Sequence, residues 1–195
     1  MSARIFKYIW FASLTLTFFT CSIFTPTTPK PGAVDIEREE QAVYATFLSG
    51  SRGLVLILQD TSTSMGDDPQ RTIDYIRSGL KNMSTETLEN FLERNKQPSQ
   101  LSPDMDLGAP YTLISRDDLH KITSQSNWED VLNETYPGSH GYMMFSRVGF
   151  NDTLGQALVY VGQVARPLMG AGYYYLMEKR KGQWTIKGQV MVWIS

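Results

Sequence analysis

The stretch GAGYYYLMEKRKGQWTIKG, residues 170–188, decides how the C-terminal part of the chain folds. It contains four aromatic rings, so it is either a platform for a ligand or the packed core of a β-hairpin. Two β-prone runs, 172–179 and 183–194, flank the pair Lys181 and Gly182. A Lys-Gly pair between two such runs predicts a hairpin with a tight turn.

The three consecutive tyrosines of this hairpin cannot share one surface. Successive side chains of a strand point to opposite faces, so Tyr173 and Tyr175 share one face and Tyr174 takes the other. We therefore expect these rings to pack within the sheet. Tyr174 is one candidate binding residue, and Trp184 is expected to pack across the strands from Glu178 or Lys179.

Working outward, short turns separate four β-rich runs, which cover residues 142–148, 156–164, 172–179 and 183–194. Sequential strands with short connections predict an antiparallel meander. A further apolar run at 53–59 lies between turn residues and predicts a strand buried on both faces or at the centre of a sheet. The sheet is thus expected to hold four to five strands.

Helical spacing dominates the chain before this meander. Apolar residues repeat at helical intervals, with caps at Asp35, at Asp68, at Ser84 or Thr85, and at Ser115. The segment 98–110 holds three prolines and predicts a surface loop. The predicted helices lie near residues 34–48, 69–80, 85–95, 116–122 and 128–135.

Helices first and strands last define an α+β fold, with N-terminal helices packed on a C-terminal antiparallel meander. The order of elements is similar to that of cystatin-like and nuclear-transport-factor-like folds, as an analogy of fold alone. We expect one domain over residues 34–195, since this length and an apolar content of 42% can supply one core.

The N-terminus carries a targeting pattern. Arg4 and Lys7 precede an uncharged apolar run over residues 8–24. The run is short for a membrane span and long for a cleaved signal, so residues 1–24 are predicted to be a signal peptide or a membrane anchor. Residues 25–33 are predicted to be a proline-rich linker. The pattern predicts export to the periplasm or cell surface, with the membrane as a partner of this segment.

Cys21, the only cysteine in the chain, lies near the end of that run. A cysteine at this place is typical of a lipoprotein, in which it carries the lipid after cleavage. The preceding Phe18, Phe19 and Thr20 depart from the usual leucine and small residues. Lipidation at Cys21, a cleaved soluble form and an uncleaved anchor therefore stay as alternatives. The folded part has no cysteine, so its stability must come from burial alone.

Composition excludes several classes of function. A net charge of −2 and a pI near 5.7 leave no basic field for a phosphate backbone, so no nucleic-acid partner is expected. Gly170 and Gly172 precede a strand, so they do not form a dinucleotide fingerprint. Two histidines without a domain cysteine make a protein metal site difficult. We expect no cofactor, no metal and no catalytic residue.

Two further side chains are candidate binding residues. His140 lies between glycines, which indicates a loop, and it or His120 with a nearby carboxylate would be the centre of a hydrolase. Arg147 lies in a β-rich run, where its guanidinium can pair with a carboxylate or bind backbone carbonyls, and a structural role is the favoured interpretation.

The segments Ser146–Asn151, Ala157–Val161, Gly170–Lys179 and the closing Val192–Ser195 resemble those of a family of uncharacterised exported bacterial proteins. Residues 42–45 and 85–91 are similar to the same family. The resemblance covers most of residues 34–195. It implies export and a compact domain, and it implies no particular chemistry.

These observations predict an exported cell-envelope protein that binds a small ligand or an envelope protein and is not an enzyme. The alternatives are an envelope hydrolase that uses His140 or His120, and a purely structural envelope protein. A cleft lined by a histidine and a carboxylate would favour the hydrolase, whereas an exposed apolar patch would favour a binding partner.

Overall fold

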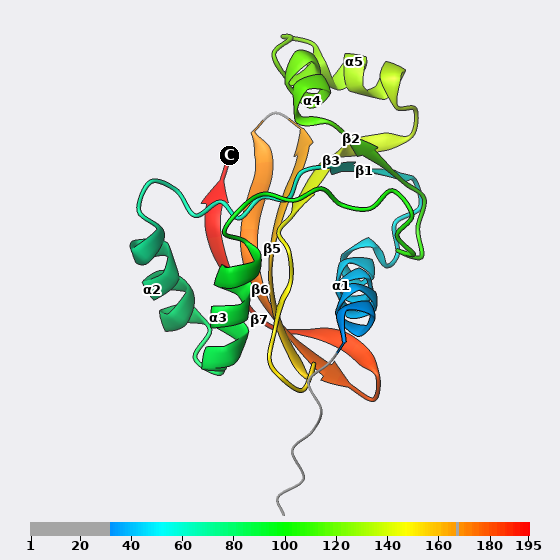
Figure 1. Cartoon of the computed structure of the whole chain (residues 1–195). Coiled ribbons are helices and arrows are strands. Elements are labelled where there is room, and N and C mark those ends of the chain that lie inside the picture. Colours follow the sequence, from blue (N-terminus) through cyan, green and yellow to red (C-terminus); the bar gives the residue numbers. More distant parts are fainter. Residues whose placement is uncertain (1–31, 167) are drawn as a thin grey trace, which may run out of the picture.

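A computed structural model describes residues 32–195 with the exception of residue 167 (Figure 1). Within this described part the chain forms five helices and seven strands. The helices are α1 Ala33–Leu48, α2 Pro69–Gly79, α3 Thr85–Arg94, α4 Arg116–Thr123 and α5 Trp128–Thr135. The strands are β1 Leu54–Leu58, β2 Tyr111–Ile114, β3 Ser139–Phe145, β4 Gly149–Phe150, β5 Gln156–Arg166, β6 Met169–Arg180 and β7 Gln183–Ile194.

All seven strands belong to one mixed sheet. Its order is β2-β1-β3-β5-β6-β7, with β4 paired to β5. The run from β3 through β7 is antiparallel, as predicted for the C-terminal part. The prediction of a purely antiparallel sheet of four to five strands is wrong, because β1 is parallel to both of its neighbours and the sheet has more strands. The analogy to cystatin-like and nuclear-transport-factor-like sheets does not include this parallel part.

The parallel pairing follows from the helices between the strands. Helices α2 and α3 lie between β1 and β2, and helices α4 and α5 lie between β2 and β3. Such helical crossovers return the chain in the same direction, as parallel strands require. The strand β2 has four residues directly after Pro110, too short a run to show a β pattern in the sequence.

The predicted hairpin is confirmed. Strand β6 ends at Arg180, β7 begins at Gln183, and the two turn residues Lys181 and Gly182 have φ values of +50° and +81°. Two successive positive φ values are those of a type I′ turn, which matches the twist of the paired strands. Trp184 lies directly opposite Lys179 in the register.

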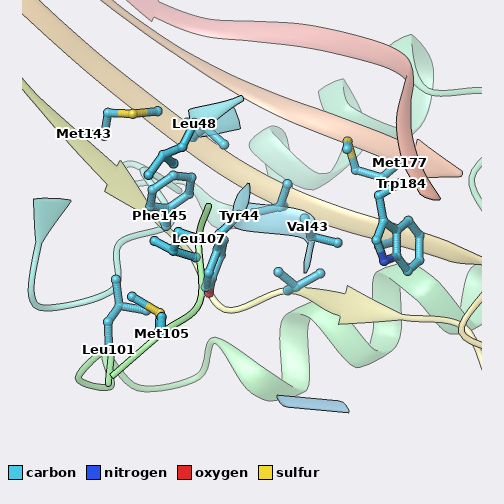
Figure 2. Packing of buried hydrophobic residues seen from close by; sticks show 14 of the residues in the cluster. Val43, Tyr44, Leu48, Leu101, Met105, Leu107, Met143, Phe145, Met177 and Trp184 are labelled. Carbon is cyan, nitrogen blue, oxygen red and sulfur yellow. The ribbon is translucent and has the colours of Figure 1, made fainter. Parts of the chain in front are cut away.

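The helices cover the two faces of the sheet unequally (Figure 1). On one face α1 packs on the central strands, where Tyr44 and Leu48 meet Phe145, and Trp184 lies at the far end of the same cluster (Figure 2). On the other face, α2 and α3 pack on β5, β6 and β7, while α4 and α5 pack near β1 and β2. The predicted caps Asp68, Ser84 and Ser115 each accept a backbone N–H bond at the start of α2, α3 and α4. The predicted cap Asp35 is wrong, because α1 begins at Ala33 with Gly32 as its N-cap and Asp35 lies in the first turn.

The tyrosines separate by face as predicted. Tyr173 and Tyr175 have ring centroids 5.7 Å apart, and Tyr175 packs against Phe47 of α1. Tyr174 is buried on the opposite face, with its ring edge toward Phe91.

No helix in the described residues is both long enough and apolar enough to cross a bilayer. The predicted signal peptide or anchor over 1–24, with Cys21, lies outside the described residues, as does all of the predicted linker except its last two residues.

Candidate functional site

A buried carboxylate stands at the centre of a polar network between α1 and the sheet. The oxygens of Glu40 accept bonds from the Nε of Arg147 at 2.9 and 3.0 Å and from Arg94 at 2.9 Å. The backbone N–H of Val148 donates at 2.7 Å and the hydroxyl of Tyr44 at 3.1 Å. A buried charge is tolerated when it is paired and hydrogen-bonded, which explains how Glu40 stays in the core.

Arg147 is held at both its side chain and its main chain. Its guanidinium is bidentate on Glu40, with a closest ion-pair distance of 2.8 Å. Asn95 donates to the carbonyl of Arg147 and accepts from its N–H, both at 2.9 Å. Burial alone would lower the pKa of Arg147, but the hydrogen bonds and charge of Glu40 raise it above its usual value. The carboxylate partner predicted for Arg147 is therefore Glu40 of α1, and this ion pair joins the helix to the segment after β3.

The neighbouring Glu39 holds the hairpin. It accepts from the Nε1 of Trp184 at 2.8 Å and pairs with Lys179 at 2.5 Å. Only 6% of Trp184 is exposed, and the ammonium group of Lys179 lies 5.8 Å from the centre of its ring. Trp184 is thus packed, as predicted, and its ring is not an exposed platform.

Tyr174, a predicted binding residue, lies within the core. Its hydroxyl donates to the backbone carbonyl of Thr63, and burial raises the pKa of Tyr174 far above its usual value. Its ring packs between Phe91 and Tyr160. It presents no open face to a ligand.

A hollow of about 510 Å³ opens beside the C-terminal end of α1, on the face of the sheet that α1 covers. We call it the apolar groove, and no charged side chain lines it. Leu168 is 85% exposed and Ile194 is 72% exposed at its margin. Its main lining residues are Phe47, Val161, Leu168, Met169, Tyr173, Tyr175 and Ile194. Two tyrosines of the opening stretch therefore do line a surface, although Tyr174 does not.

The end of α1 leaves this hollow open, and the packing of Trp193 on the opposite face of the sheet closes it from behind. The helix stops at Leu48, and Gly50 with a φ of +89° turns the chain away before α1 can cover the end of the sheet. Behind the groove, on the opposite face, the ring of Trp193 lies over Gly172, where an added Cβ would come within 2.0 Å of the indole nitrogen. The Nε1 of Trp193 also donates to Tyr160 at 2.7 Å. The floor of the groove is thus closed from behind.

A second hollow, of about 620 Å³, lies between α5 and the tip of the β5–β6 hairpin. We call it the polar cleft. It is lined by His140 and by three charged side chains, Glu129, Asp130 and Arg166. The prediction of a loop at His140 is wrong, because this residue lies in strand β3. Ser139 also lines it, and its Oγ is buried without a hydrogen-bond partner among the described residues. His140 therefore does meet carboxylates in a cleft, as the hydrolase alternative requires.

The same geometry leaves a serine triad unformed. Because the Oγ of Ser139 has no hydrogen-bond partner in the described part of the chain, His140 does not activate it. Asp118, a carboxylate that a triad with His140 could use, forms an ion pair with Lys121 at 2.7 Å within α4. His120 lies on α4, with its Nδ1 3.5 Å from the hydroxyl of Ser124. No group of three histidine, cysteine or acidic side chains within 32–166 and 168–195 is placed to hold a metal ion.

The apolar groove and the polar cleft adjoin at the β5–β6 tip, since Ala165 and Met169 line both. The sequence predicts a turn at these residues, and this turn was not predicted to line a site. The available signal was the pair Leu168 and Met169, two large apolar residues within a predicted turn.

The resemblance to exported bacterial proteins rests on the segments quoted above and remains a prediction. No family model matches the chain, and comparison with curated proteins and with solved structures gives no significant match.

Proposed function

We propose that the chain is an exported cell-envelope protein whose folded domain binds an apolar ligand at the apolar groove and does not catalyse a reaction. The apolar groove, which no charged side chain lines, carries this proposal. The pattern of Arg4 and Lys7 before the run 8–24 supports export.

Binding fits the groove because its apolar walls gain by leaving water. Burial of apolar surface contributes roughly 25 cal/mol per Å². Leu168, Met169 and Ile194 expose large apolar side chains around one hollow, and such gathered exposure is typical of ligand or partner sites. Its volume of about 510 Å³ lies within the range of roughly 300–1,000 Å³ that small-molecule sites occupy.

A hydrolase is the second candidate, and the polar cleft is the observation that favours it. His140 shares this cleft with Glu129 and Asp130. The cleft offers no activated nucleophile, because the buried Ser139 hydroxyl makes no hydrogen bond to any described residue. We therefore favour binding of an apolar ligand over hydrolysis as the function.

The test is titration of the full-length chain with N-phenyl-1-naphthylamine, a neutral apolar fluorophore. Leu168→Asp and Ile194→Asp should weaken binding by about tenfold or more, because an apolar ligand desolvates the new carboxylate. Tyr75→Asp is the matched control, since Tyr75 is exposed on α2 at the opposite face. The apolar run 8–24 is present in every variant, so its contribution to probe binding cancels.

Equal affinities of wild type, Leu168→Asp and Ile194→Asp would contradict the proposal. Hydrolysis of p-nitrophenyl esters that disappears in His140→Ala would support the hydrolase instead.

A further inference from the structure

We infer that the ligand is an amphiphile with one apolar chain and a zwitterionic head, the chain in the apolar groove and the head in the polar cleft. This inference rests on the proposed function and assigns its ligand class. Its basis is that Ala165 and Met169, at the tip of the β5–β6 hairpin, line both hollows, so a ligand that passes this tip can reach from one hollow to the other.

The groove favours an unbranched apolar chain over a polar group. Its walls are aliphatic and aromatic, and its polar side chains, such as Gln163, are uncharged. A charged group would lose its hydration here without gaining an ion pair.

The cleft carries charges of both signs that are not used within the described fold. Glu129, Asp130 and Arg166 are exposed and form no ion pair or side-chain hydrogen bond with any other described residue. An anionic head alone would face two carboxylates, and a cationic head alone would face a guanidinium. A head with both charges satisfies all three side chains.

The positions of these charges set the order of the head. Arg166 lies opposite Met169 in the β5–β6 register, and Met169 lines both hollows, so Arg166 is placed at the junction between them. Glu129 and Asp130 lie on α5, across the cleft. The anion therefore lies next to the chain and the cation lies beyond it, as in a phosphodiester that links an alkyl chain to an amine.

One further group suits such a head. Trp128 is half-buried at the start of α5 and lines the cleft, and an aromatic side chain is a favourable neighbour for an alkylated ammonium.

The experiment compares four single-chain ligands that share a dodecyl chain: dodecylphosphocholine, dodecyl phosphate, dodecyltrimethylammonium and dodecyl maltoside. Each displaces N-phenyl-1-naphthylamine from the full-length chain below its critical micelle concentration. We expect dodecylphosphocholine to bind about three- to fivefold more tightly than dodecyl maltoside, the range that one exposed ion pair provides. The two singly charged ligands should show no such gain.

Charge variants assign the effect to the cleft. Arg166→Gln and the double variant Glu129→Gln with Asp130→Asn should each remove the preference for dodecylphosphocholine while leaving dodecyl maltoside unchanged. Arg166→Lys should retain it. Glu134→Gln, on α5 outside the cleft, and Arg77→Gln, on α2, are the matched controls.

The outcomes separate the two proposals. Four equal dissociation constants, or a preference for one of the singly charged ligands, would overturn the zwitterionic head while the groove still binds the chain. A preference that survives both charge variants would also overturn it. Probe binding that is insensitive to Leu168→Asp would instead reject the groove itself.

Discussion

The middle and the C-terminal end of α1 meet the sheet in opposite ways. Midway along the helix, Glu39 and Glu40 tie it to Trp184, Lys179 and Arg147 through buried hydrogen bonds and ion pairs. At its C-terminal end, Phe47 contacts Tyr175 and then borders an open hollow. The middle of α1 is fixed to the sheet by polar contacts, and its C-terminal end leaves apolar surface uncovered.

This difference teaches how a single helix can both secure a sheet and expose a site. Polar groups in a core must be satisfied in one geometry, so Glu39 and Glu40 specify where α1 lies on the sheet. The apolar surface near the C-terminal end of α1 imposes no such geometry and stays available to a ligand. Substitutions around Glu39 and Glu40 should therefore affect stability, and substitutions in the apolar groove should affect binding.

The largest expected effect is that of Trp184→Ala. It removes a buried ring and leaves the carboxylate of Glu39 without the indole N–H, so the free energy of unfolding should fall by about 3–5 kcal/mol. Urea denaturation measures this. Ile186→Ala, an exposed change on the same strand, is the control and should cost less than about 0.5 kcal/mol. A loss below about 1 kcal/mol for Trp184→Ala would show that the attachment of α1 to the hairpin does not depend on this ring.

Arg147→Ala should cost about 2 kcal/mol. Breaking a buried ion pair costs about 3–5 kcal/mol, but about a quarter of the Arg147 side chain is exposed, at 27%, and Arg94 still pairs with Glu40. Affinity for the apolar probe should not change. Arg38→Ala breaks an exposed ion pair of the same helix with Asp35 and serves as the control. An unchanged melting temperature with lost probe binding would make Arg147 a ligand residue.

The third-largest effect on stability is expected from alkaline pH, which should weaken the contacts around Glu40. Burial, and then the charge of Glu40, raise the pKa of Tyr44 well above its usual value. A tyrosine with a raised folded-state pKa stabilises the fold fully below the unfolded pKa of about 10, and this contribution is lost as pH rises from there toward the folded pKa. At pH 11 the loss for Tyr44 should be about 1.4 kcal/mol. Denaturation from pH 8 to 11 should show a smaller decline in Tyr44→Phe than in wild type, and equal declines would refute this assignment.

The smallest effect on stability belongs to the groove. Leu168→Asp changes a side chain that is 85% exposed, so the free energy of unfolding should shift by less than about 0.5 kcal/mol. Probe affinity should fall in the same variant. A large loss of stability would mean that Leu168 supports the fold. The groove would then no longer differ from the contacts around Glu39 and Glu40, which stabilise the domain.

Local patterns in the sequence predicted most of the elements. Lys181 and Gly182 specified their turn, and the caps at Asp68, Ser84 and Ser115 specified three helix starts, because each depends on neighbouring residues only. The parallel pairing of β1 with β2 and β3 was missed. It depends on where the crossover helices return the chain, and no local spacing encodes that path.

The candidate site was less accessible to sequence reasoning. The sequence indicates His140 and Tyr174 as candidate binding residues. His140 lines the polar cleft, whereas Tyr174 is buried and its neighbours Tyr173 and Tyr175 line the groove. Alternation separated the tyrosines correctly but could not say which face α1 would leave partly open. That depends on where α1 ends above the sheet, which is a property of the packed molecule.

The contacts of Glu39 also bear on the order in which the molecule folds. Glu39 bonds to side chains 140 and 145 residues further along the chain. Contacts of such sequence separation form slowly, because the entropy of closing the intervening loop must be lost first. The β6–β7 hairpin closes through a two-residue turn and can form within microseconds. Helix α1 is therefore expected to dock late, onto a β6–β7 hairpin that is already formed.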